Sequence, residues 1–135
     1  MTKAAPPTPT IASRRRLAVA AGGALGAAAR WSVAATAGAV GFDTPAATLT
    51  VNVSGAFLLG LVVARHTGRF RASPLLIPFV GVGLLGAFTT FSLFSTEVLA
   101  LARDGSWALA VVYPIVSVAG GFAAAFLGLR MGARR

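Results

Sequence analysis

One polar stretch inside an apolar segment carries the side chains of this sequence that are best suited to chemistry. Residues 83–98, GLLGAFTTFSLFSTEV, place a phenylalanine at every third position and hydroxyl groups between the rings. On a helix, with about 100° between successive residues, the rings share one arc and the hydroxyl groups spread along an adjoining arc. One helix would therefore present an aromatic ridge beside a row of hydrogen-bond donors. The ridge comprises Phe88, Phe91 and Phe94, and the row comprises Thr89, Ser92, Ser95 and Thr96.

The composition places this stretch in a membrane. Of the 135 residues, 56% are hydrophobic and 11% are charged, and the mean hydropathy is +0.81, which is far too apolar for a soluble domain of this size. The length allows about four membrane spans of about 20 residues each. We expect an all-α membrane protein with a disordered tail at 1–13 and one domain at 14–135. The expected spans are about 17–40, 48–64, 74–101 and 107–129.

The third span is expected to be broken near its middle. Pro78, Gly81, Gly83 and Gly86 precede the polar run, and this density of proline and glycine predicts an interrupted helix. A break leaves carbonyl groups without helical donors, and such backbone is tolerated at membrane depth only where it is buried or lines a cavity. Free carbonyl oxygens that point inward could coordinate a cation.

Polar residues in the other spans leave alternatives open. Arg30 interrupts the first span, where we favour a structural role as an interfacial anchor over a role in a water-filled path. Asn52, in the second span, either bonds to a neighbouring helix or faces an aqueous pore. Tyr113 and Ser117 share one face of the last span and either extend a polar path or bond to other helices. Glu97 is expected near a membrane face, in a vestibule.

Small residues in the first span predict close packing. Gly22 and Gly26 form a GxxxG pair, and this spacing lets two helix backbones approach each other within a membrane. The same pattern occurs in many membrane helices, so it indicates helix packing and no particular function.

The charges indicate a topology. The net charge is +9, from 12 Lys and Arg against 3 Asp and Glu. Four spans put ten of the 12 basic residues on the side of the two termini, and leave Arg30 and Arg103 on the other side. The positive-inside rule then predicts cytoplasmic termini. Because the basic residues flank apolar segments and are not interleaved with aromatic residues, nucleic acid is not an expected partner.

Three segments together closely resemble the small bacterial fluoride channels of the Fluc/CrcB family. They are GGALGAAARW at 22–31, TLTVNVSGAFLLG at 48–60 and GLLGAFTTFSLFSTE at 83–97, of which the third is the most specific. The resemblance covers nearly the whole chain after the tail. It implies passive export of fluoride across the plasma membrane, which relieves fluoride toxicity, by four-helix subunits that pair antiparallel around two pores.

The resemblance also implies roles for individual residues. Phe91 and Phe94 match the pore phenylalanines, and Asn52 matches the pore asparagine. Gly86 and Thr89 match positions whose backbone carbonyl groups hold a central structural Na⁺. The other implied positions are a hydroxyl path of Ser92, Ser95, Thr96, Tyr113 and Ser117, and a pore mouth with Arg30 and Glu97.

These residue types suit fluoride. Removing water from this small anion is very costly, and hydroxyl and amide donors can replace that water. The positive edge of a phenyl ring adds weak attraction, and conduction needs binding that is firm enough for entry and weak enough for exit. The charge bias departs from the family pattern, because members encoded by a single gene usually insert in both orientations. We therefore hypothesise one fixed orientation and pairing with a related, oppositely inserted subunit.

Other classes of protein fit less well. Small multidrug-resistance transporters also have four short helices, but they need a glutamate in the first helix, and residues 17–40 contain no Asp or Glu. With no cysteine, one histidine and three acids far apart in the sequence, no catalytic constellation is visible, so an enzyme is not expected. A membrane protein that only binds partners would leave the clustered phenylalanines and hydroxyl groups unexplained.

Overall fold

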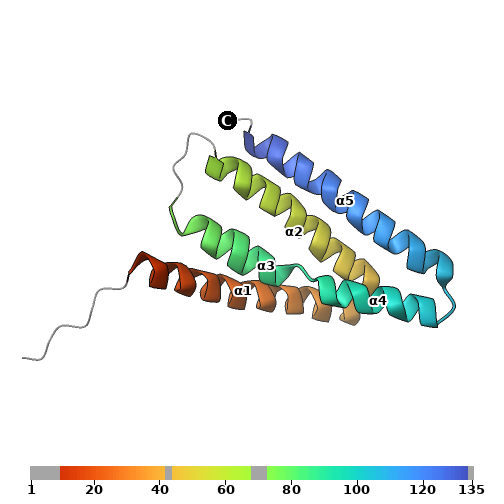
Figure 1. The fold of residues 1–135 in the computed structure, drawn as a ribbon. Coiled ribbons are helices and arrows are strands. Elements are labelled where there is room, and N and C mark those ends of the chain that lie inside the picture. The colour runs from red at the N-terminus through yellow and green to blue at the C-terminus, as the bar shows by residue number, and fades with distance from the viewer. Residues whose placement is uncertain (1–9, 42–43, 68–72, 134–135) are drawn as a thin grey trace, which may run out of the picture.

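All the secondary-structure elements of the described residues are helices. The computed structural model describes residues 10–41, 44–67 and 73–133 (Figure 1). The elements are α1 (Ile11–Ala39), α2 (Thr44–Thr67), the π-helical η1 (Ile77–Leu85), α3 (Gly86–Phe88), α4 (Phe91–Arg103) and α5 (Trp107–Ala133). Four stretches are long and apolar enough to cross a membrane, namely Ile11–Ala39, Thr44–His66, Ile77–Arg103 and Trp107–Ala133. The expected all-α membrane protein with four spans is confirmed for these residues.

The helices extend beyond the apolar runs that predicted them. α1 begins at Ile11, so residues 11–13 are helical and the prediction of a disordered tail is wrong for them; residues 1–9 lie outside the described part. Thr10 explains the early start, because its side-chain oxygen accepts a hydrogen bond from the Ser13 N–H at 3.3 Å and caps the helix. α2 begins at Thr44 instead of 48, and α5 continues to Ala133 instead of 129. Backbone hydrogen bonding therefore continues where hydrophobicity stops.

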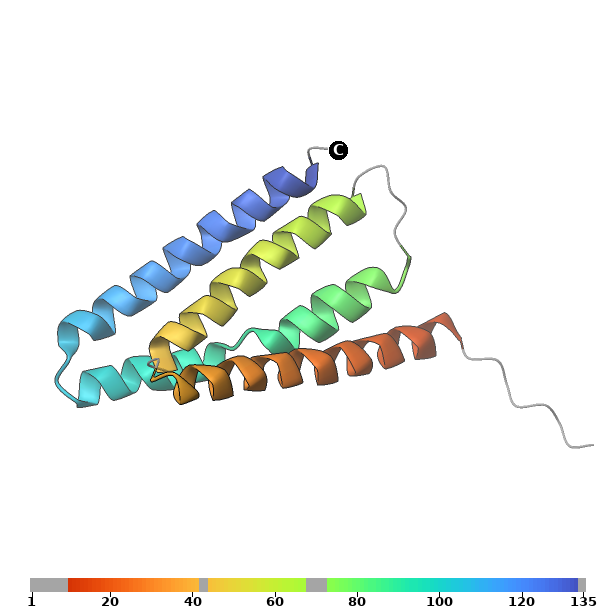
Figure 2. The same ribbon diagram turned by 180° about the vertical axis from the view of Figure 1, so that it is seen from behind.

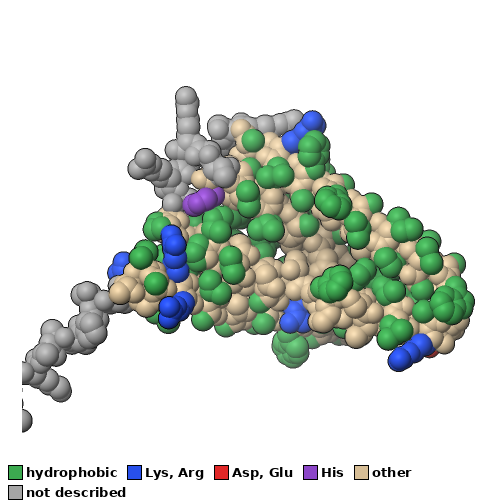
Figure 3. Space-filling view, in the orientation of Figure 1, with side chains coloured by type: hydrophobic (Ala, Val, Ile, Leu, Met, Phe, Trp, Pro, Cys, Tyr) green, Lys and Arg blue, Asp and Glu red, His purple; other side chains and the backbone are tan. Residues whose placement is uncertain are grey.

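The helices associate in two parallel pairs. α2 packs along α5, and α1 packs along η1 and α3. Figures 1 and 2 show that the two members of each pair run in the same direction, and that the pairs converge near α4 and diverge toward the start of α1. Large apolar side chains cover much of the outside, among them Leu17, Trp31 and Phe122 (Figure 3). An outer surface of this kind is suited to lipid rather than to water.

Glycines allow the close approach within each pair. A Cβ atom on Gly22 would collide with the Phe79 carbonyl oxygen, and one on Gly26 would collide with the Leu84 carbonyl oxygen. The predicted close packing at the GxxxG pair is therefore confirmed. In the other pair, Gly60 and Gly128 leave equally little room for a side chain between α2 and α5.

The basic side chains of the described residues lie mainly at one end. α1 begins there with Arg14, Arg15 and Arg16, and α2 and α5 end there with Arg65 and Arg130 (Figures 1 and 3). The other end carries Arg103 and Asp104, where α4 turns into α5. The remaining basic residues on the side of the termini lie outside the described residues, namely Lys3, Arg69, Arg71, Arg134 and Arg135.

Candidate functional site

Two extended residues separate α3 from α4. α3 ends at Phe88, and Thr89 (φ −74°, ψ 157°) and Thr90 (φ −145°, ψ 125°) leave the helical conformation before α4 begins at Phe91. Extended residues cannot continue the hydrogen bonding of a helix, so backbone groups on both sides need partners from elsewhere. Side chains from α1 and α2 provide these partners.

Asn52 of α2 binds the backbone of Thr90 with both ends of its amide. Its Nδ2 donates to the Thr90 carbonyl oxygen at 2.9 Å, and its Oδ1 accepts from the Thr90 N–H at 2.8 Å. In a continuous helix this N–H would donate to the carbonyl group of Gly86, which therefore loses its helical donor. Of the two alternatives for Asn52, the bond to a neighbouring segment is observed. A primary amide has two N–H groups, so one of them remains for another acceptor.

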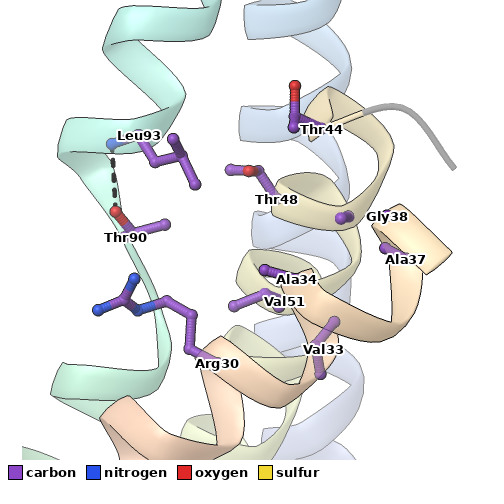
Figure 4. Close-up of a pocket in the computed structure, with 11 residues that line it drawn as sticks. Arg30, Val33, Ala34, Ala37, Gly38, Thr44, Thr48, Val51, Thr90 and Leu93 are labelled. Atoms are coloured by element: carbon purple, nitrogen blue, oxygen red, sulfur yellow. Dashed lines mark hydrogen bonds between the residues drawn. The ribbon is translucent and has the colours of Figure 1, made fainter.

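Arg30 of α1 binds the backbone on the other side of the interruption. Its Nε donates to the Ala87 carbonyl oxygen at 3.1 Å, and the side chain reaches toward the extended segment (Figure 4). A continuous helix would supply this carbonyl group with the N–H of Phe91. An unpaired backbone group in lipid costs several kcal/mol. Arg30 and Asn52 therefore stabilise the interrupted conformation.

A small pocket lies beside the extended segment. Its volume is about 70 Å³, which is room for about two water molecules. Its walls are mostly apolar side chains of α1, α2 and α4, and its polar groups come from Arg30, Thr44, Thr48 and Thr90 (Figure 4). Arg30 is the one charged residue among the residues that line this pocket, and its guanidinium group keeps its charge in proteins.

An aromatic row follows the start of α4. The ring centroids of Phe91 and Phe94 are 5.8 Å apart, and those of Phe94 and Tyr113 are 5.3 Å apart, with the rings tilted. Phe88 does not continue the row on the same helix, because the interruption separates it from Phe91. The predicted three-residue ridge is therefore wrong for Phe88. Phe91 has 79% of its surface exposed, so the row opens on the outside of the single chain.

The hydroxyl groups of α4 are bonded to the backbone of their own helix. Ser95 Oγ donates to the Phe91 carbonyl oxygen at 2.9 Å, and Thr96 Oγ1 donates to the Leu93 carbonyl oxygen at 2.8 Å. Thr90 caps α4, since its Oγ1 accepts from the Leu93 N–H at 3.2 Å and lies 3.4 Å from Ser92 Oγ. A hydroxyl group has one proton, so Ser95 and Thr96 must rotate before they can donate to an anion.

Glu97 is buried between three helices. Only 7% of its surface is exposed; Thr48 of α2 donates to its Oε1, and Tyr113 of α5 donates to its Oε2, each at 2.7 Å. Two hydroxyl donors hold the carboxyl group between the helices, and Glu97 also lines an open hollow with Asp104 and Tyr113 near the turn between α4 and α5, so its expected vestibule position stays a prediction. Tyr113 thus bonds to a neighbouring helix. Ser117 Oγ is buried without a hydrogen-bond partner among the described residues.

Four of the predicted residues thus meet in two groups, and sequence reasoning missed one member of each. Arg30, Asn52 and the unpredicted Thr90 meet at the interruption, while Glu97 and Tyr113 meet at the unpredicted Thr48. The spacing of Thr48 and Asn52 offered a signal, since residues four apart share a helix face. Thr90 also offered one, because a threonine ahead of a helical run is a common N-cap.

Comparison with known proteins supplies further information. A family model described as CrcB-like protein, Camphor Resistance (CrcB), matches residues 17–129. The fluoride-specific ion channel FluC of Saccharophagus degradans is 44% identical over 118 residues, which cover 87% of this chain and 86% of that protein. FluC of Magnetococcus marinus is 46% identical over 115 residues, or 84% of this chain and 94% of that protein. FluC 1 of Mycobacterium tuberculosis is 42% identical over 114 residues, or 84% of this chain and 86% of that protein.

Proposed function

Because this chain belongs to the CrcB-like family, we propose that it is a fluoride-specific ion channel through which fluoride leaves the bacterial cytoplasm passively, which relieves fluoride toxicity. The observation that carries this function is the interruption at Thr89 and Thr90, which joins a polar path to an aromatic row at membrane depth. The relatives named as fluoride-specific channels match the chain over this entire region.

Fluoride would exchange its water for donors along α4. The free N–H of Asn52 and the hydroxyl groups of Ser92, Ser95 and Thr96 supply hydrogen bonds, and the ring edges of Phe91 and Phe94 supply weak attraction. The carbonyl groups that accept from Ser95 and Thr96 lie inside α4, where they also have helical donors. Rotation of these hydroxyl groups toward an anion, and back to the carbonyl groups, therefore costs little free energy. Binding of this reversible kind is what conduction requires.

The proposed entrance has one basic and one acidic residue. Arg30 brings its positive charge to the small pocket, while Thr48 and Tyr113 donate hydrogen bonds to the two oxygens of the Glu97 carboxylate and so weaken its repulsion of an anion. Beyond Tyr113, Ser117 lies one turn further along α5 and offers a buried hydroxyl group with no other partner among the described residues. Tyr113 and Ser117 extend the path that begins at Phe91, and Arg30 and Glu97 border its entrance.

A second subunit would close the path. Phe91, Ser92, Ser95 and Thr96 are exposed on the single chain, so an ion on this surface would meet lipid on one side. An antiparallel partner would cover the surface and give two pores. The bias of the basic residues toward one end favours a plasma-membrane orientation with both termini in the cytoplasm. It therefore also favours a related, oppositely inserted subunit as the partner.

The interruption also fits a structural Na⁺ at the centre of such a dimer. The Gly86 carbonyl group has lost its helical donor, and the extended backbone of Thr89 turns its carbonyl group out of the helical alignment. Carbonyl oxygens are ligands that replace the hydration shell of a monovalent cation. The ion would supply a fixed positive charge where the two interruptions meet.

Fluoride efflux from liposomes tests the proposed function. The purified chain is reconstituted alone, and the efflux of fluoride is compared with that of chloride. We expect fluoride-selective efflux that falls in Phe91→Ile. If the chain alone is silent, it is co-expressed with a paralogue of opposite charge bias. Silence of that pair as well would refute the channel.

A further inference from the structure

The contact between Arg30 and the interrupted span is made by one particular atom. Nε of the side chain, and not the end of the guanidinium group, donates to the Ala87 carbonyl oxygen at 3.1 Å. We propose that Arg30 is a positioning residue, which fixes the interruption through its Nε–H, and that this role outweighs the effect of its charge on the ion. The inference rests on the proposed channel function and deepens it.

The close packing of α1 against η1 and α3 places Arg30 for this role. Gly22, Gly26 and Arg30 are spaced four residues apart, so they follow one face of α1. The two glycines bring that face against the backbone of η1 at Phe79 and Leu84. This approach sets the distance from the Arg30 backbone to the end of α3. A side chain of the length of arginine then brings its Nε, rather than its terminal nitrogens, to Ala87.

The Arg30 contact is one of two that hold the extended residues. Arg30 fixes Ala87 from α1, and Asn52 fixes Thr90 from α2 with two hydrogen bonds. Thr89 lies between these two fixed points. The direction in which α4 starts, and with it the orientation of Phe91, depends on both. Loss of the Nε–H would free one of the two points while leaving the other intact.

Two substitutions separate the donor from the charge. Glutamine carries an N–H donor, Nε2, at the same position along the side chain as arginine Nε, but it has no charge. Lysine keeps the charge but has a methylene group at that position. If the Nε–H matters, Arg30→Gln should hold the interruption as the unmodified chain does and should conduct better than Arg30→Lys. If the charge matters, the order should be reversed.

The experiment combines fluoride efflux with backbone amide exchange of the full-length protein in liposomes. We expect Arg30→Gln to keep amide exchange within about threefold of the unmodified chain, the scale of one ordinary hydrogen bond, and to lose less efflux than Arg30→Lys. We expect Arg30→Lys to lose efflux, and to exchange the amides of 88–93 about tenfold faster, because it leaves the part-buried Ala87 carbonyl oxygen unpaired. The amides of 51–60 in α2 should exchange as in the unmodified chain.

Every other pattern overturns the inference. Efflux in Arg30→Lys with loss in Arg30→Gln would assign the role to the charge, and normal behaviour of both would make Arg30 dispensable. Loss in both variants with faster exchange throughout the chain would show a need for arginine in the whole fold. If the unmodified chain and its pair with a paralogue conduct no fluoride, the channel itself is refuted. The amide exchange of the two variants still tests the Arg30 contact in that case.

Discussion

At the scale of residues, single side chains stabilise the interruption of the helix at Thr89 and Thr90. Each end of the interruption has a backbone group that a continuous helix would have paired, and each is paired instead by a side chain from another helix. Asn52 is suited to this because an amide donates and accepts at once, as a backbone peptide does. A residue that can only donate, or only accept, would pair either the Thr90 carbonyl oxygen or the Thr90 N–H, but not both.

Asn52→Asp tests the double hydrogen bond. An ionised aspartate accepts from the Thr90 N–H but repels the Thr90 carbonyl oxygen, and it also repels fluoride. We expect fluoride efflux to fall by more than about tenfold, since the part-buried Thr90 carbonyl oxygen loses its donor. Ser54→Ala on the same helix is the control, because Ser54 Oγ donates only to carbonyl oxygens of its own helix. Comparable efflux from both variants would contradict the role of Asn52.

Tyr113→Phe tests the bond that holds Glu97. The substitution keeps the ring contact with Phe94 and removes the donor to Glu97 Oε2. We expect the free energy of unfolding in detergent to fall by about 1–3 kcal/mol, because a buried carboxyl oxygen is left unpaired. Ser32→Ala on α1 is the matched control, since that exposed hydroxyl group donates only to Ala28 of its own helix. Equal stability of the two variants would show that the Tyr113 bond contributes nothing.

At the scale of elements, backbone contact between helices replaces a conventional core. Gly22 and Gly26 let α1 approach η1, and Gly60 and Gly128 let α2 approach α5. In lipid, where burial of apolar surface does not favour helix association, such close packing is a main source of stability. The same contacts set the positions from which Arg30 and Asn52 reach the interruption.

Gly26→Ala tests the close packing of α1 on η1, with a neighbouring glycine as the control. A Cβ atom at Gly26 would collide with the Leu84 carbonyl oxygen, whereas one at Gly23 would meet nothing within 4 Å. We expect Gly26→Ala to lower the free energy of unfolding by about 1–3 kcal/mol through overpacking. Gly23→Ala should be neutral or raise it by up to about 1 kcal/mol, because alanine favours the helix. The reverse order would show that α1 does not pack on η1 at Gly26.

At the scale of the whole molecule, charge and exposure point to a subunit that needs a partner. The basic residues at the end where α1 begins favour one orientation in the membrane. The exposed Phe91 and the hydroxyl groups beside it leave the proposed path open on one side. A partner inserted the opposite way would complete that path.

Labelling of single cysteines tests the orientation, and the chain suits this method because it contains no cysteine. A reagent that cannot cross the membrane is added to intact spheroplasts of cells that lack any paralogue. We expect Ser106→Cys, in the turn before α5, to be labelled, and Thr10→Cys, before α1, to be labelled only after lysis. Labelling of both positions from outside would show insertion in both orientations and would support an identical partner instead.

The number of spans, their approximate positions and the polar stretch follow from the sequence alone, because hydrophobicity and helix propensity are local properties of the chain. The tertiary structure decided which groups meet at that stretch. Arg30 lies 57 positions from its acceptor Ala87, and Asn52 lies 38 positions from Thr90. Such pairs depend on how closely the helices approach each other, and the glycines between α1 and η1 and between α2 and α5 determine that distance. The burial of Glu97 and the separation of Phe88 from Phe91 likewise depend on where the backbone leaves the helix, and no local pattern fixes that residue.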